Sequence, residues 1–73
     1  MKPQYIVSNP QILAGKPVFS GTRICVSMVV NHLANGWTID QMLQEFPTLK
    51  LEYIQEALKL SAYLINNDEI VYA

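Results

Sequence analysis

From residue 26 onward, the apolar positions follow a helical period. In the first such stretch they fall at residues 26, 29, 30, 33 and 34, which is the spacing of one buried helix face. Ser27 is a candidate N-cap for this helix. Gly36 fits the position just after its last turn, because glycine accepts the left-handed conformation that ends a helix. The pattern therefore predicts a first helix between these two residues.

Two further helices are predicted after it. Thr38 and Gln41 have the spacing of a capping box, in which each side chain bonds the backbone N–H of the other residue. Pro47 ends this second helix. A third helix is predicted from about residue 51 to residue 64, and the Asn-Asn-Asp sequence at residues 66–68 closes it. The apolar face of the second helix comprises Ile39, Met42, Leu43 and Phe46.

Residues 1–25 have the composition of strands and turns. Residues 5–7 form a short β-type run that the turn residues 8–10 end. Residues 18–19 and 24–26 are two more apolar pieces, and the turn residues 20–22 between them predict a β-hairpin. The tail at residues 69–72 also has β character and is a candidate strand of the same sheet.

The expected fold is mainly α, with a small N-terminal β-hairpin followed by a three-helix, homeodomain-like helix-turn-helix unit. We expect a single domain over residues 1–73, made of a hairpin arm (1–26), a three-helix bundle (27–66) and a C-terminal tail (67–73). The short second helix, a turn and a longer third helix give the helix-turn-helix layout.

The third helix carries more apolar surface than one contact needs. At about 100° per residue, its apolar residues form two rows roughly 110° apart. One row is Leu51, Ile54, Leu58 and Ile65, and the other is Tyr53, Ala57, Leu60 and Leu64. The second row is a candidate dimer face; the alternative is that both rows are buried within one chain.

Composition favours a small folded domain with a partner. The chain has 73 residues, of which 51% are hydrophobic and 15% charged, and this balance argues against disorder. A chain of this length buries only about 60% of its unfolded surface, which argues against a free-standing enzyme with a deep pocket. Its core supplies roughly 3–5 kcal/mol, so a second subunit or a partner protein is expected.

The charge balance favours protein binding over DNA binding. Five Lys and Arg residues stand against six Asp and Glu residues, whereas strong nucleic-acid binders usually have a basic surplus. The polar arc of the third helix carries Glu52 and Glu56 against Lys59, with Lys50 at its start. Carboxylates repel phosphates, so this face is a poor reader of a major groove.

Neither catalytic nor metal chemistry is predicted. Cys25 is the single cysteine, so there is no internal disulfide, and it has no base near it in the sequence. His32 has no metal ligand at helical spacing beside it. We expect no enzymatic activity, no cofactor, no metal and no small-molecule substrate. The sequence has neither a signal-peptide pattern nor an apolar run long enough to span a membrane, so a cytoplasmic location is expected.

Several short motifs resemble one family. Residues 15–26 read GKPVFSGTRICV, which resembles the signature G-K-P-x-x-x-G-T-R-I-x-V of short prokaryotic proteins grouped as the domain of unknown function 433 family. The stretches LANG at residues 33–36 and FPTL at 46–49 resemble further motifs of that family, as do residues 54–58. One position departs from the pattern: Cys25 stands where the family usually has proline, which removes a rigid φ at the strand-to-helix junction.

The resemblance implies a function as well as a fold. Members of this family resemble homodimeric helix-turn-helix proteins, and many are thought to be antitoxins paired with a PIN-like ribonuclease toxin. By this resemblance the chain would bind and neutralise such a toxin and would repress its own operon by binding DNA. The alternative function is that of a stand-alone helix-turn-helix transcriptional regulator.

The residues of these motifs divide into structural and contact candidates. Gly15, Gly21 and Thr22 are expected to shape turns. Arg23 has two interpretations of equal weight, a pairing with a carboxylate of its own chain or a contact to a phosphate or partner carboxylate. The full set of candidate DNA or partner contacts is Lys16, Arg23, Lys50, Tyr53 and Lys59.

Overall fold

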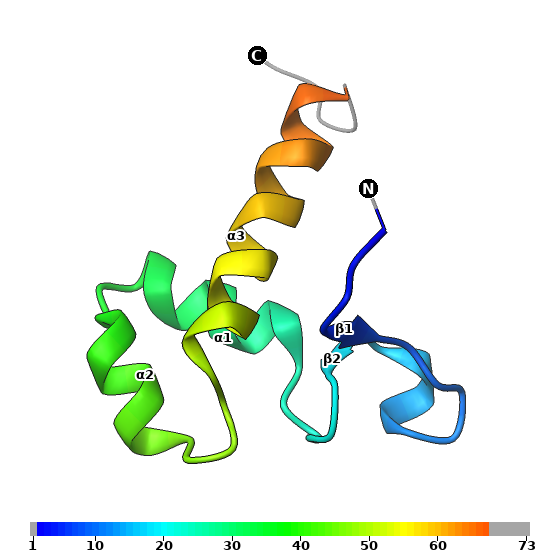
Figure 1. The fold of residues 1–73 in the computed structure, drawn as a ribbon, viewed down its shortest axis with the longest axis horizontal. Helices are drawn as coiled ribbons and strands as arrows, with labels where there is room; N and C mark the ends of the chain where they lie inside the picture. Colours follow the sequence, from blue (N-terminus) through cyan, green and yellow to red (C-terminus); the bar gives the residue numbers. More distant parts are fainter. Residues whose placement is uncertain (1, 68–73) are drawn as a thin grey trace.

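A computed structural model describes residues 2–67 of the chain. Three helices and a small antiparallel sheet make up the fold, which is mainly α as the sequence predicts (Figure 1). The candidate strand at residues 69–72 lies outside the described residues. In chain order the elements are β1 (Ile6–Val7), the 3-10 turn η1 (Leu13–Gly15), β2 (Val18–Phe19), α1 (Val26–Ala34), α2 (Ile39–Glu45) and α3 (Leu51–Asn66).

The sheet pairs β1 with β2, while the predicted hairpin of residues 18–19 with residues 24–26 is present in a shorter form. Ile6 lies opposite Phe19 and Val7 opposite Val18 in an antiparallel register. The segment at residues 24–26, predicted as the partner of residues 18–19, forms a bridge between Val18 and Cys25, and its Ile24 carbonyl accepts the N–H of Phe19 at 3.1 Å. Its pairing ends there because α1 begins at Val26.

The junction between the sheet and α1 differs from the prediction at its cap. Cys25, and not Ser27, is the N-cap residue of α1, and its side chain makes no capping hydrogen bond. The N–H of Val26 donates to the carbonyl of Pro17 at 3.1 Å, so the first residue of α1 is hydrogen-bonded to the residue that precedes β2. Cys25 has a φ of −68°, close to the value that proline would fix, so proline would fit this position without a change in φ.

The ends of the first two helices follow the predicted signals. Gly36 has a φ of +97° just after α1, as expected of a glycine that ends a helix. Thr38 and Gln41 form the predicted capping box of α2: the Gln41 N–H donates to the Thr38 hydroxyl at 3.1 Å, and the Thr38 N–H donates to Gln41 Oε1 at 2.8 Å.

The core lies where the three helices meet β2. Its fully buried side chains come from β2, α1, α2 and α3, and the rings of Tyr5, Phe19 and Tyr53 pack in series through it. The Tyr5 and Tyr53 ring centroids are 5.1 Å apart, and those of Phe19 and Tyr53 are 5.7 Å apart. The largest fully buried side chains are Phe19, Met42, Ile54, Val18 and Val29.

Only the first half of α3 belongs to this core. Tyr53, Ile54 and Ala57 are its buried residues, and none follows Ala57 within the helix. The helix ends at Asn66, two residues beyond the predicted end, and at 1.5 Å per residue it is about 24 Å long. Its second half therefore projects from the body of the fold (Figure 1).

Candidate functional site

The projecting half of α3, residues 58–66, carries large apolar side chains that remain exposed. Leu58, Tyr63, Leu64 and Ile65 have exposed fractions between 41% and 46%. Lys59 is the single charged residue in this segment. A helix that is apolar on several sides is normally buried, so this half of α3 is a candidate contact surface.

The apolar row of α3 that was predicted as a dimer face is buried at its start and exposed at its end. In the row proposed as a dimer face, Tyr53 and Ala57 are buried inside their own protomer, at 9% and 1% exposure, so assigning them to an interface between chains was wrong. Leu60 is half-buried and Leu64 is exposed. The change along this row arises because α3 extends beyond the other helices and the sheet, so no residue after Ala57 is buried.

Tyr53 is likewise removed from the candidate contacts for DNA or a partner. Its ring lies between Tyr5 and Phe19 in the core. The Lys50 ammonium lies 5.8 Å from the centre of the same ring, in a cation–π arrangement. Lys50 itself is exposed at the start of α3.

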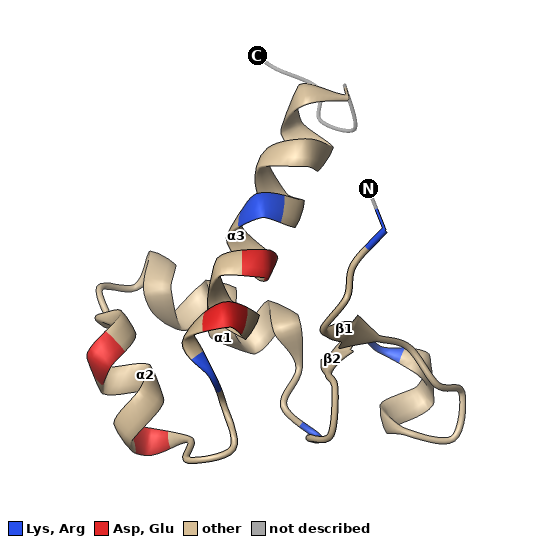
Figure 2. Ribbon diagram, viewed as in Figure 1, with Lys and Arg blue, Asp and Glu red and all other residues tan. Residues whose placement is uncertain are grey.

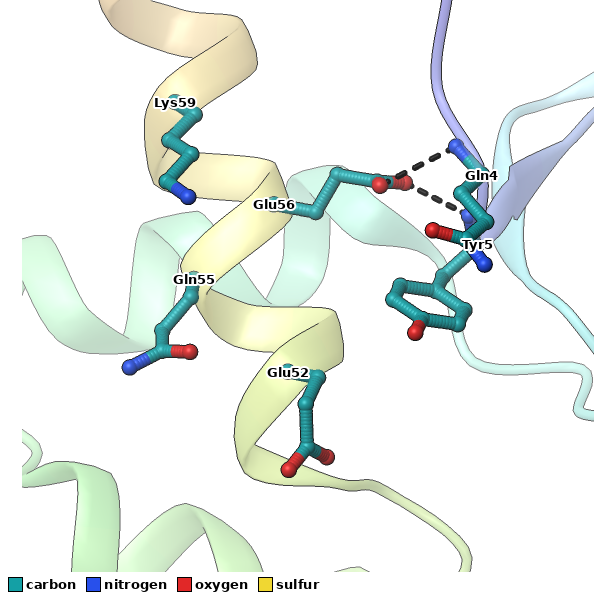
Figure 3. Close-up of a pocket in the computed structure, with 6 residues that line it drawn as sticks. All are labelled: Gln4, Tyr5, Glu52, Gln55, Glu56 and Lys59. Carbon is teal, nitrogen blue, oxygen red and sulfur yellow. Dashed lines mark hydrogen bonds between the residues drawn. The ribbon is translucent and has the colours of Figure 1, made fainter.

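Glu56 fastens the N-terminal segment to α3. Its carboxylate accepts the backbone N–H of Gln4 at 3.0 Å and that of Tyr5 at 2.6 Å. Figure 3 shows Glu56 pointing towards these two residues while Gln55 extends away from them. The sequence placed Glu56 on a solvated arc, and no local signal could reveal a contact that joins residues more than fifty positions apart.

A small polar pocket lies beside this contact. Its volume is about 260 Å³, below the range of 300–1,000 Å³ typical of sites for drug-sized ligands. Glu56 already uses both of its oxygens for the backbone. We therefore assign no small-molecule site to it. Its lining residues are Gln4, Tyr5, Glu52, Gln55, Glu56 and Lys59.

The turn residues of the family motif have structural roles. Gly21 has a φ of +76°, a conformation that favours glycine. The Thr22 hydroxyl donates to the carbonyl of Phe19 at 2.8 Å and accepts the N–H of Ile24 at 3.0 Å, which closes the turn. Gly15 also has a positive φ, of +83°, and its carbonyl accepts a hydrogen bond from the Ser8 hydroxyl.

The cations do not gather into one surface. Figure 2 shows the basic residues spread over separate loops, the start of α3 and the middle of α3, with acidic residues on α2 and α3. Lys16, Arg23 and Lys59 are exposed, on three different parts of the fold. A continuous basic stripe, which a phosphate backbone would require, is absent from residues 2–67.

Neither a metal centre nor a membrane span emerges from the described part of the chain. Within it, no group of three His, Cys, Asp or Glu side chains could hold a metal ion. None of its helices is both long and apolar enough to cross a bilayer.

The left-handed turn η1 is a further feature that the sequence did not reveal. Leu13 and Ala14, which are not glycines, have φ values of 50° and 55°. Leu13 is also 45% exposed. The pattern of residues 11–15 gives no turn signal apart from Gly15, so this backbone could not be predicted.

Comparison with known proteins identifies relatives along most of the chain. The family model described as "Protein of unknown function (DUF433)" matches residues 6–60. "Uncharacterized protein y4eO" of Sinorhizobium fredii is 39% identical over 54 residues, which are 74% of this chain and 24% of that protein. The present chain thus spans about a quarter of that relative's length.

A solved structure has the same fold. The crystal structure of a DUF433 member protein from Anabaena variabilis superposes with a TM-score of 0.72 at 26% sequence identity, covering 89% of this chain and 61% of that one. The family motifs, the match over residues 6–60 and this shared fold agree, and the chain belongs to the DUF433 family.

Proposed function

We propose that this chain is an antitoxin-like protein that binds and neutralises a PIN-like ribonuclease toxin. The proposed contact is the distal face of α3, formed by Leu60, Tyr63 and Leu64. The identification of the partner as a ribonuclease rests on the family resemblance. The choice of a protein partner is supported by the surface of the helix itself.

One observation carries the proposal. Leu64 continues the row that begins with Tyr53 and Ala57 in the core, yet it is 43% exposed. A partner that covers the distal face would extend the protomer's own core along the helix. Fully burying an exposed leucine side chain contributes about 1.5–3 kcal/mol, so covering the 43% of Leu64 that is exposed contributes roughly 1 kcal/mol, to which Leu60 and Tyr63 add.

The chemistry of the face indicates the kind of surface it fits. Residues 60–66 carry no charge, so a complementary surface is an apolar groove that receives one side of a helix. Tyr63 adds an aromatic ring with a polar tip, a residue type enriched at the energetic centres of protein interfaces.

Co-expression with the product of the adjacent reading frame, which this proposal expects to be a ribonuclease, tests this function. We expect the two chains to purify as a stable complex in which ribonuclease activity is lost. A ribonuclease that stays free and fully active beside an excess of the folded chain would contradict the proposal.

A stand-alone transcriptional regulator is the second candidate, favoured by the α2–turn–α3 layout. Glu52 is exposed at the start of α3, and the chain has a net charge of −1, so we expect weak DNA binding. In gel shifts with its own promoter at physiological salt, the isolated chain should bind no tighter than about 10⁻⁶ M. Tighter binding with a steep salt dependence would favour the regulator instead.

A further inference from the structure

A second exposed row on α3 has the spacing of a coiled-coil seam. Its members follow one another at intervals of four, three, four and three residues, the spacing at which apolar residues repeat in paired helices. All five are exposed, and the three large ones are 41%, 42% and 46% exposed. This outer seam consists of Leu51, Gln55, Leu58, Ala62 and Ile65.

The outer seam borders the core at Ile54, which shares a row with Leu51, Leu58 and Ile65, but its centre faces away from both the core and the distal face. At about 100° per residue, its mean direction lies roughly 120° from that of the buried residues Tyr53, Ile54 and Ala57. The nearest residue of the distal face, Tyr63, lies about 120° away on the other side. The seam therefore runs along a side of α3 that neither contact occupies.

The charged residues beside the seam are placed so that those of one α3 helix can form ion pairs with those of a second, antiparallel copy. Glu52 and Lys59 are exposed and occupy equivalent positions one heptad apart, each directly after a leucine of the seam. At about 1.5 Å per residue they are about 10 Å apart along their own helix, too far for an ion pair. When two such helices pair in antiparallel order, this position meets its own equivalent on the other helix.

We propose that α3 pairs with α3 of a second copy of this chain, in antiparallel order along the outer seam. Leu51 then lies opposite Ala62 of the second copy, and Gln55 lies opposite Leu58 of the second copy. Glu52 faces Lys59 of the second copy, and two-fold symmetry repeats each contact. The distal half of each helix is covered by the first half of the other.

Charge decides the direction of pairing. In parallel order, Lys59 would face the position of Ile54 and Glu52 that of Pro47, neither of which is charged, so no ion pair would form. Antiparallel order forms two ion pairs and places the two bodies at opposite ends of the helix pair. Gln55, the polar residue of the seam, lowers the stability of the pair while helping to fix its register.

The proposed interface is small, so the dimer is expected to be weak. It uses five seam residues and two charged residues on each side, against about 20–30 residues in a standard stable interface. A dissociation constant on the order of 10–100 μM is therefore expected.

Charge reversal tests the pairing by sedimentation equilibrium over about 5 μM to 1 mM protein. The Lys59→Glu and Glu52→Lys variants each place like charges opposite one another twice, so each should self-associate at least about tenfold more weakly than the wild type. The double variant Glu52→Lys/Lys59→Glu should recover wild-type association. Lys16→Glu, an equal change of charge on an exposed residue away from α3, should have no effect.

A mixing experiment sharpens the test. When the two single variants are combined in equal amounts, every facing pair is again of opposite sign, so a mixed dimer should form although neither variant pairs with itself. A wild type that stays monomeric to 1 mM, or a dimer that is insensitive to these substitutions, would overturn the proposal. The pairing does not depend on the proposed ribonuclease, and distal-face substitutions such as Leu64→Asp should leave it intact.

Discussion

Phe19→Ala should leave this chain largely unfolded at room temperature. Phe19 is fully buried, stacks on Tyr53, and belongs to the core cluster that also holds buried residues of all three helices. Removing a buried phenylalanine ring costs about 3–5 kcal/mol, because the transfer energy is lost and a cavity remains. A core of this size supplies only about the same amount. Urea denaturation followed by circular dichroism measures the loss.

Two further variants make this result interpretable. Phe19→Leu keeps most of the buried volume and should cost about 1.5 kcal/mol or less, so it remains measurable if Phe19→Ala does not fold. Leu58→Ala removes a large apolar side chain that is 42% exposed, and should change the free energy of unfolding by no more than about 0.5 kcal/mol when measured on dilute, monomeric protein. Equal losses for Phe19→Ala and Leu58→Ala would contradict the assignment of the core.

Glu56→Ala should have the second largest effect, by releasing the N-terminal segment from α3. The substitution removes two charge-assisted hydrogen bonds, from the N–H groups of Gln4 and Tyr5, and loosens the packing of Tyr5 on Tyr53. Such bonds contribute about 1.5–3 kcal/mol each when buried, but this site is partly solvated, so we expect a total loss of about 2 kcal/mol. Hydrogen exchange at the Tyr5 amide should accelerate in parallel.

The matched variants for this prediction lie at the same site and one turn away. Glu56→Gln keeps one acceptor oxygen and should lose about half as much stability. Glu52→Ala removes an exposed carboxylate from the same helix and should cost no more than about 0.5 kcal/mol when measured on dilute, monomeric protein. Unchanged exchange at Tyr5 in Glu56→Ala would show that the carboxylate does not hold the segment.

The helices could be predicted from sequence because their signals are local. The capping box of Thr38 and Gln41 and the positive φ of Gly36 each depend on residues within one turn, and both predictions are confirmed. The start of α1 was predicted less well. Ser27 has the right residue type for an N-cap, but α1 begins one residue before it, at Val26, whose N–H is hydrogen-bonded to the carbonyl of Pro17.

The strand pairing and the exposed surfaces could not be predicted in the same way. β2 pairs with residues 6–7 across the turn η1, whose left-handed residues Leu13 and Ala14 carry no turn signature. The periodicity of α3 located its apolar rows but could not tell where the body of the fold ends. Tyr53 and Leu64 belong to one row by spacing, and only the three-dimensional packing separates the buried residue from the exposed one.

The central claim is that the distal face of α3 binds the ribonuclease. The affinity of two matched variants for the ribonuclease tests this claim most directly. Leu64→Asp places a charge in the centre of the distal face, whereas Leu13→Asp makes the same change at an equally exposed leucine, with a positive φ that aspartate tolerates. We predict that Leu64→Asp weakens binding at least about hundredfold, while Leu13→Asp binds like the wild type. Wild-type affinity in a folded Leu64→Asp variant would contradict the proposed role of α3.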